Sequence, residues 1–260
     1  MRVGDVEIIP VSDGWFHMPK EFFPGADWSG HEDLFDHDGK LDLPIGCFLI
    51  RTGDTTVLVD AGFGPTHHAA LTGGALPSAL AAHGVRPADV DVVVCTHLHL
   101  DHAGWLVQDG APFFPNATVR FGAGDWERWV DGAREGDHVA ASMRLLDALQ
   151  RLEAIDGDGV SIAPGITTRA APGHTMGHQV LVVSSGTERA LLLGDSITCP
   201  LQLQHEDWGA ASDMDPALAR RTRELLWTEL ESEGTVGVGA HFPELQHGRV
   251  LVGSGRTWFA

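Results

Sequence analysis

The segment CTHLHLDHAG, residues 95–104, gathers three histidines and one aspartate within six positions. His97 and His99 are two residues apart, so in an extended segment their side chains point to the same side and can close on one ion. In a helix they would point about 200° apart around the axis. Asp101 and His102 lie further along the turn and can reach a second ion. Histidine makes up only 15 of the 260 residues, so the cluster favours a metal site over a polar loop.

Further candidate ligands follow other apolar runs of the chain. His174 lies in PGHTMGH after ITTRA, Asp195 lies in LLLGDS, and His241 lies in GAHFP after TVGVG. Loops at one edge of a sheet often build a site together, so we expect these side chains to meet the first cluster. Imidazoles and carboxylates suit zinc and tolerate iron, manganese or cobalt. Seven candidate ligands result, enough for two divalent ions: His97, His99, Asp101, His102, His174, Asp195 and His241.

The elements that must position these ligands are short β-rich runs with helical segments between them. Strands are expected over 6–11, 47–52, 55–62, 91–96, 117–122, 179–185 and 189–195. Apolar residues at steps of three or four predict helices over 138–152 and 215–230, the second with Asp215 as N-cap and Pro216 in its first turn. This mixture predicts mixed sheets covered by helices in a single domain, residues 1–260.

Composition narrows the function. Acidic residues number 36 and basic residues 17, which gives a formal net charge of −19. Such a field disfavours nucleic acids and anionic membranes as partners, and a bound pair of divalent ions would offset about four charges. Three cysteines without a CxxC pair indicate a reducing compartment. Since neither a signal peptide nor a membrane span is expected, the prediction is a cytoplasmic protein with a small-molecule substrate, and a homodimer is left open.

The order HxHxDH, His, Asp, His resembles the metallo-β-lactamase superfamily of metal-dependent hydrolases. TTVLVDAGFG is similar to the family's strand that ends in an Asp-Gly turn, and residues 75–104 are similar to its helix, strand and first metal loop. The resemblance implies an α+β fold, an αββα sandwich of two mixed β-sheets flanked by helices. It implies that one metal is held by His97, His99 and His174, that the other is held by Asp101, His102 and His241, and that Asp195 bridges the two.

The resemblance is nearest to the single-domain lactonase and organophosphate-hydrolase branch, with residues 1–45 as an N-terminal extension over the active site. It implies a di-metal hydrolase that uses a metal-bridging hydroxide to cleave a small apolar ester or lactone, or a phosphotriester. Asp101 is then either a pure ligand or also a catalytic proton shuttle. Lactonases of this kind often place a tyrosine soon after the bridging aspartate, whereas this chain has none.

Other residues have supporting roles in this interpretation. Asp60 would orient a ligand or its loop, unless it only caps a turn, and His178 would stabilise its loop from behind the ligands. Aromatic side chains either wall an apolar substrate pocket or simply pack on the core. The candidates for substrate binding are Trp15, Phe16, Phe22, Trp105 and His205.

Two alternatives remain at this stage. The first is a non-catalytic or redox di-metal protein on the same fold. The second is a serine esterase similar to the GDSL family, with Ser196 of GDSI as nucleophile.

Overall fold

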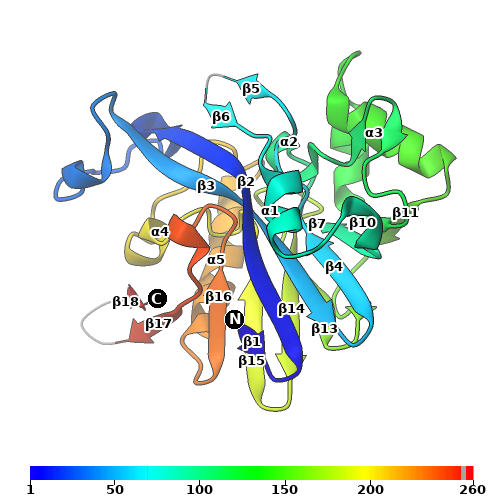
Figure 1. The fold of residues 1–260 in the computed structure, drawn as a ribbon. Coiled ribbons are helices and arrows are strands. Elements are labelled where there is room, and N and C mark those ends of the chain that lie inside the picture. The colour runs from blue at the N-terminus through cyan, green and yellow to red at the C-terminus, as the bar shows by residue number, and fades with distance from the viewer. Residues whose placement is uncertain (69, 253–255, 260) are drawn as a thin grey trace.

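Two mixed β-sheets pack face to face between helices in the computed structural model, which describes residues 1–259 except 69 and 253–255 (Figure 1). The first sheet runs β11 (Leu152–Ile155), β10 (Thr118–Gly122), β7 (Val92–Cys95), β4 (Thr55–Val59), β3 (Lys40–Thr52), β2 (Val6–Pro19), β6 (Leu71–Thr72) and β5 (His67–His68), with β1 (Arg2–Val3) beside β2. The second runs β12 (Ser161–Ala163), β13 (Ile166–Ala170), β14 (Gln179–Ser185), β15 (Glu188–Leu192) and β16 (Thr235–Val238).

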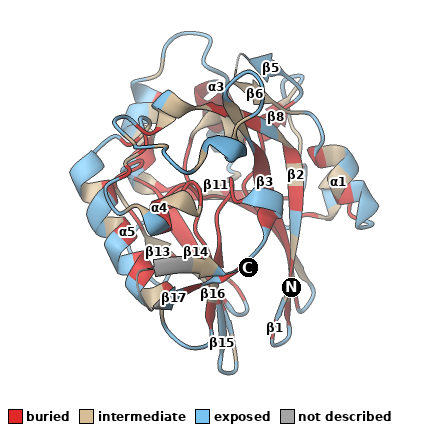
Figure 2. Ribbon diagram, turned by 90° about the vertical axis from the view of Figure 1, so that its left-hand side faces the viewer, coloured by how far each residue is buried: buried red, intermediate tan, exposed pale blue. Residues whose placement is uncertain are grey.

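Short hairpins and helices complete the fold. The hairpins are β8 (Val107–Gln108) with β9 (Ala111–Pro112), and β17 (Arg249–Val252) with β18 (Arg256–Phe259). The α-helices are α1 (Leu76–Ala82), α2 (Leu100–Ala103), α3 (His138–Ala148), α4 (Leu201–Gln204) and α5 (Pro216–Leu230). Figure 2 shows α1 and α5 on opposite sides of the molecule with the buried strands between them.

Alternation along the central strands builds the layers. In β3, Phe48 and Ile50 face the core shared with the second sheet and α5, while Leu49 faces the core under α1 and α3. In β4, Leu58 lies on the α1 side, and its two neighbours lie on the other. Because successive side chains of a strand point to opposite faces, one apolar run serves both cores. The expected αββα sandwich is confirmed.

The two long helices match the predicted ones closely. α5 begins as expected, since the Asp215 side chain accepts a hydrogen bond from the Leu218 amide and Pro216 occupies the first turn. α3 ends at Ala148 rather than at residue 152. Gln150 has a φ of 56°, a left-handed conformation that stops the helix, and the Arg151 amide then bonds back to the Leu146 carbonyl.

The N-terminal segment is more regular than the sequence suggests. β2 continues from Val6 to Pro19 and pairs antiparallel with β3 from Glu7 opposite Arg51 to Pro19 opposite Lys40. A shift of register between Ser12 and Gly14 lets the strand continue past its turn-like residues. Residues 2–3, 6–19 and 40–45 are therefore part of the first sheet, and residues 20–39 connect the far ends of its two long strands.

The direction of the strands brings several loops to one edge. β4 and β7 are parallel, and β13, β15 and β16 share one direction within the second sheet. Asp60, His97, Asp195 and His241 each follow the carboxyl end of one of these strands.

The three cysteines, all in the described part of the chain, are buried and unpaired. Over the same residues no helix has the length and hydropathy needed to cross a membrane.

Candidate metal centre

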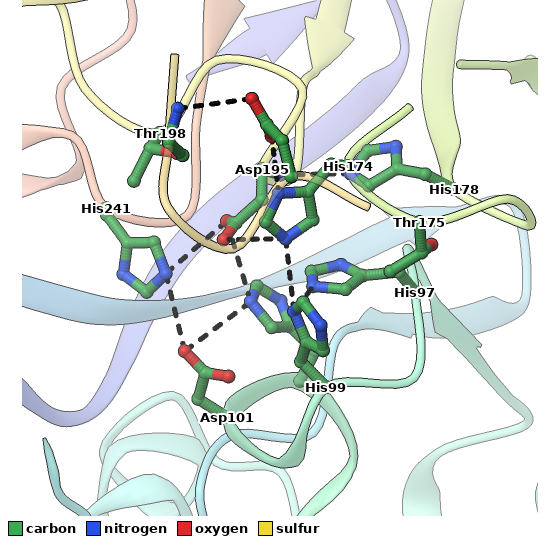
Figure 3. Close-up of polar contacts among 12 residues, drawn as sticks. His97, His99, Asp101, His174, Thr175, His178, Asp195, Thr198 and His241 are labelled. Carbon is green, nitrogen blue, oxygen red and sulfur yellow. Dashed lines mark hydrogen bonds and ion pairs between the residues drawn. The ribbon is translucent and has the colours of Figure 1, made fainter. Parts of the chain in front are cut away.

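The first of two side-chain groups at this edge consists of His97, His99 and His174, whose ring nitrogens converge (Figure 3). His99 Nδ1 lies 2.8 Å from His97 Nε2 and 3.1 Å from His174 Nε2. His97 and His99 stand in the short, bent stretch between β7 and α2, where His99 has an extended backbone. Three ring nitrogens that point at one place could hold one metal ion.

The second group consists of Asp101, His102 and His241. His241 Nε2 lies 3.5 Å from Asp101 Oδ2, and His102 Nε2 lies 3.7 Å from the same oxygen. Asp101 and His102 occupy the first turn of α2 rather than an irregular turn. This short helix directs both side chains toward the loop after β16, which carries His241.

Asp195 stands between the two groups. Its Oδ2 lies 3.5 Å from His174 Nε2 in the first group. Its Oδ1 lies 3.5 Å from His102 Nε2 and 3.4 Å from His241 Nε2 in the second. One oxygen thus faces each group, the arrangement of a carboxylate shared by two ions. The structure brings all seven sequence-predicted ligands together.

Polar groups behind the histidines fix how the rings are turned. His102 Nδ1 donates to Asp60 Oδ2 at 2.9 Å, and His241 Nδ1 donates to the Pro44 carbonyl at 2.8 Å. His174 Nδ1 donates to Asp213 Oδ1 at 3.1 Å. Because a neutral imidazole with its hydrogen on Nδ1 keeps a lone pair on Nε2, each of these rings can present that lone pair to the centre in its neutral form.

Two buried atoms at the centre show that divalent cations fit it. Within the described part of the chain, His102 Nε2 and Asp195 Oδ1 have no hydrogen-bond partner. A buried polar atom without a partner is costly, and a cation between these nitrogen and oxygen atoms would satisfy both. The donor set of imidazoles and carboxylates is one that zinc accepts.

The electrostatics of the centre favour a cation in the same place. Burial, and then the neighbouring imidazoles, hold the pKa of His97 well below its usual range, while burial lowers the pKa of His99 to about 3. Both rings are therefore neutral and able to ligate. Burial opposes a charge on His102 too, yet Asp60, Asp101 and Asp195 outweigh it and raise its pKa to about 9.

His178 holds the loop that carries Asp195. Its Nε2 accepts the Asp195 amide at 3.0 Å, so its hydrogen is on Nδ1, which donates to Ser196 Oγ at 3.1 Å. A ring in that state cannot take the proton of Ser196, and Ser196 is only 3% exposed. This geometry argues against the serine esterase alternative.

Gly194, at a φ of 52°, has no room for a Cβ, which would lie 2.7 Å from His178 Nε2.

A cavity of about 320 Å³ opens onto the centre. Apolar side chains from the N-terminal segment and β6 form one wall, and candidate ligands form the floor. The ring of Phe16 lies 5.5 Å from that of His241. The lining residues are Phe16, Pro19, Phe22, Ala70, Leu71, His99, Asp101, Asp195, Ser212 and His241.

Of the five residues expected to bind substrate, Phe16 and Phe22 line this cavity and three others do not. Trp15 is 51% exposed and lines a different hollow with Pro243, because neighbouring strand residues face opposite sides. Trp105 is buried, and its indole donates to Asp13 Oδ1 at 2.8 Å. His205 stacks on Trp208 with ring centroids 4.3 Å apart.

Three buried aspartates near the site escaped the sequence analysis. Asp125 accepts hydrogen bonds from the Leu98 and Gly177 amides and so joins the two loops of the first histidine group. Asp13 accepts four backbone amides between residues 63 and 76. Asp213 orients His174. In the sequence each of them stands next to a glycine or a serine. Ordinary turn-capping aspartates have the same neighbours, so the sequence does not distinguish these three from them.

Comparison with known proteins identifies the family. The model of the metallo-beta-lactamase superfamily matches residues 42–226, so the chain belongs to that superfamily. An N-acyl homoserine lactonase of Bacillus sp is 27% identical over 209 residues, which cover 73% of this chain and 79% of that protein. The expected superfamily is confirmed, and the lactonases found among the relatives agree with the expected resemblance to its lactonase-like branch.

Solved structures confirm the fold. AidC, a dizinc quorum-quenching lactonase, superimposes with a TM-score of 0.86 at 24% identity over 100% of this chain and 95% of that one. The hydrolase AbOPH of the beta lactamase superfamily superimposes with a TM-score of 0.87 at 23% identity, over 99% of this chain and 95% of that one.

Proposed function

We propose that this chain binds two divalent metal ions, zinc in the first instance, and hydrolyses lactones or esters of small, neutral and fairly apolar molecules. One observation carries the proposal: seven nitrogen- or carboxylate-bearing side chains converge beside an apolar cavity, with one Asp195 oxygen toward each group. His97, His99 and His174 would hold one ion, and Asp101, His102 and His241 the other, with Asp195 shared. Ions held there would activate a water molecule and polarise the bond to be cleaved.

The chain's own residues would bind the substrate and move the proton. Phe16, Phe22 and Leu71 offer an apolar wall for an acyl chain and exclude water from the floor. Asp101 lies on the cavity floor with its side chain 15% exposed, so a proton that it carries can reach a leaving oxygen. Asp101 would thus be both ligand and proton shuttle.

N-acyl homoserine lactones are the first substrates to test, because they are named for the relatives and combine a neutral ring with an apolar chain. The net charge of −19 disfavours polyanionic substrates. A phosphotriester remains a second substrate class of the proposal. The cytoplasmic location and a homodimer stay predictions of the sequence.

A hydrolysis panel tests the proposal. Zinc-loaded protein and the same protein treated with a chelator are compared on N-acyl homoserine lactones, aryl esters, phosphotriesters and β-lactams. We expect lactone turnover that the chelator removes and added zinc restores. Turnover that survives complete metal removal would contradict the proposed metal-dependent hydrolysis. Metal binding without any turnover would favour the non-catalytic alternative.

A further inference from the structure

A buried arginine stands behind one histidine of the candidate centre. Asp213 Oδ1 accepts the Nδ1 hydrogen of His174 at 3.1 Å, and Asp213 Oδ2 lies 3.1 Å from Arg223 Nη1. The Arg223 side chain is 2% exposed and that of Asp213 is 0% exposed. The three residues therefore form a line from the middle of α5 to the first histidine group.

Packing alone does not explain Arg223. The buried face of α5 otherwise consists of Ala219, Leu226, Trp227 and Leu230. Within the described residues, Nε of Arg223 has no hydrogen-bond partner. Apolar residues often replace a buried ion pair without loss of stability, so stability alone is a weak reason for an arginine among them.

The loop that carries His174 is attached directly to the start of α5. The Met214 amide donates to the His174 carbonyl at 3.1 Å, and the Asp215 amide donates to the Gly173 carbonyl at 3.0 Å. A Cβ on Gly173 would lie 2.2 Å from the Ala219 nitrogen, so the loop and helix touch. A displacement of α5 or of the Arg223 side chain would therefore shift His174 directly.

We propose that Arg223 is a positioning residue that sets the metal affinity of the His97–His99–His174 group by holding the Asp213 carboxylate against His174. Arg223 neutralises the buried carboxylate and fixes its plane, so that Oδ1 stays on the imidazole hydrogen. The inference rests on the proposed metal binding.

In the second group, the rings of His102 and His241 are oriented without the help of a positively charged side chain. Asp60, behind His102, accepts from the Thr96 amide and hydroxyl, and His241 donates to a backbone carbonyl. Loss of Arg223 should therefore weaken one of two metal sites and spare the other.

Zinc affinity, measured by competition with a chromophoric chelator, tests this inference. In Arg223→Met we expect one of the two zinc ions to bind about 10-fold more weakly, the lower end of the roughly 10- to 100-fold cost of losing a ligand's direct partner, because Arg223 acts through Asp213. Arg223→Lys, which restores the charge, should recover most of that affinity. Arg221→Met changes an exposed arginine of the same helix and should bind both ions as the unaltered chain does.

A double variant separates charge pairing from packing. Arg223→Met leaves the buried Asp213 carboxylate without its counter-ion, and Asp213→Asn leaves the buried guanidinium without its counter-ion, so the metal-free double variant should unfold at a higher temperature than either single one. An unaltered chain that binds no zinc would overturn the proposed function itself. If the unaltered chain binds two ions and Arg223→Met binds both as tightly, or if both sites weaken equally, the role of Arg223 is overturned.

Discussion

At the scale of single residues, Asp195 is the most consequential, because one of its oxygens faces each of the two groups. Its removal would leave the two proposed cations with less negative charge between them. We expect Asp195→Ala to bind fewer than two metal ions and to lose more kcat/KM than the roughly 10- to 100-fold cost of losing an outer partner. Elemental analysis and lactone kinetics measure both, with the exposed Asp207→Asn as control.

Near-normal turnover in Asp195→Ala would mean that the residue only ends its strand. Normal metal content with lost turnover would also contradict the shared-ligand role.

Phe22 and Trp15 provide a matched pair for substrate binding. Phe22 lines the cavity, whereas Trp15 faces another hollow. Each buried methylene of an acyl chain is worth about 0.8 kcal/mol, so longer chains should lower KM more than they change kcat. Phe22→Ala should flatten this trend and Trp15→Ala should leave it intact. A trend that persists in both Phe22→Ala and Phe16→Ala would place the acyl chain elsewhere.

At the scale of elements, the turn after β15 aims Asp195. Gly194→Ala meets both a left-handed φ and a contact with His178, whereas Gly186→Ala, at a φ of 60°, meets open space. Left-handed strain costs about 1–3 kcal/mol in either variant. We therefore expect Gly194→Ala to lose more free energy of unfolding than Gly186→Ala in urea denaturation, and to lose metal as well. If both variants lose the same free energy of unfolding and Gly194→Ala keeps its full metal content, the new methyl group is accommodated without moving His178.

The sequence is enough to select the seven candidate ligands, which the structure brings together, because they follow a local pattern: a strand-like run, then a histidine or an aspartate. The same local signals correctly predict where α5 begins. Asp13, Asp125 and Asp213 were missed because each bonds to segments that meet it only in the folded chain. Trp15 was misplaced because the sequence shows an aromatic cluster and not which strand face points to the cavity. The length of β2 was missed because pairing with β3 overrides its turn-like residues.

At the scale of the whole molecule, the stability of the metal-free form and that of the zinc-loaded form should respond differently to pH. The folded pKa of His102 is raised above the unfolded value of 6.5 to about 9, so its contribution to stability is full below pH 6.5 and is lost as pH rises through about 9. The pKa of His241 is also raised, by Asp195 and Asp101 against the effect of burial. Zinc must displace these protons, so its binding strengthens with rising pH.

Thermal unfolding measures this difference. Between about pH 7 and 8.5 we expect the melting temperature to fall in the metal-free form and to hold or rise at a fixed, subsaturating zinc concentration. His97 and His99 have lowered pKa values and stay neutral in this window, so they do not reverse the trend. A metal-free form that gains stability with pH would contradict the charges assigned to the centre.

The central claim is that two metal ions at one shared centre make this chain a lactone hydrolase. Titration of the metal-free chain with zinc, while the rate of N-acyl homoserine lactone hydrolysis is followed, tests it most directly. The seven converging ligands predict a rate that is negligible without zinc and reaches its plateau at two equivalents per chain. Full turnover by the metal-free chain, or a plateau at one equivalent or fewer, would contradict the claim.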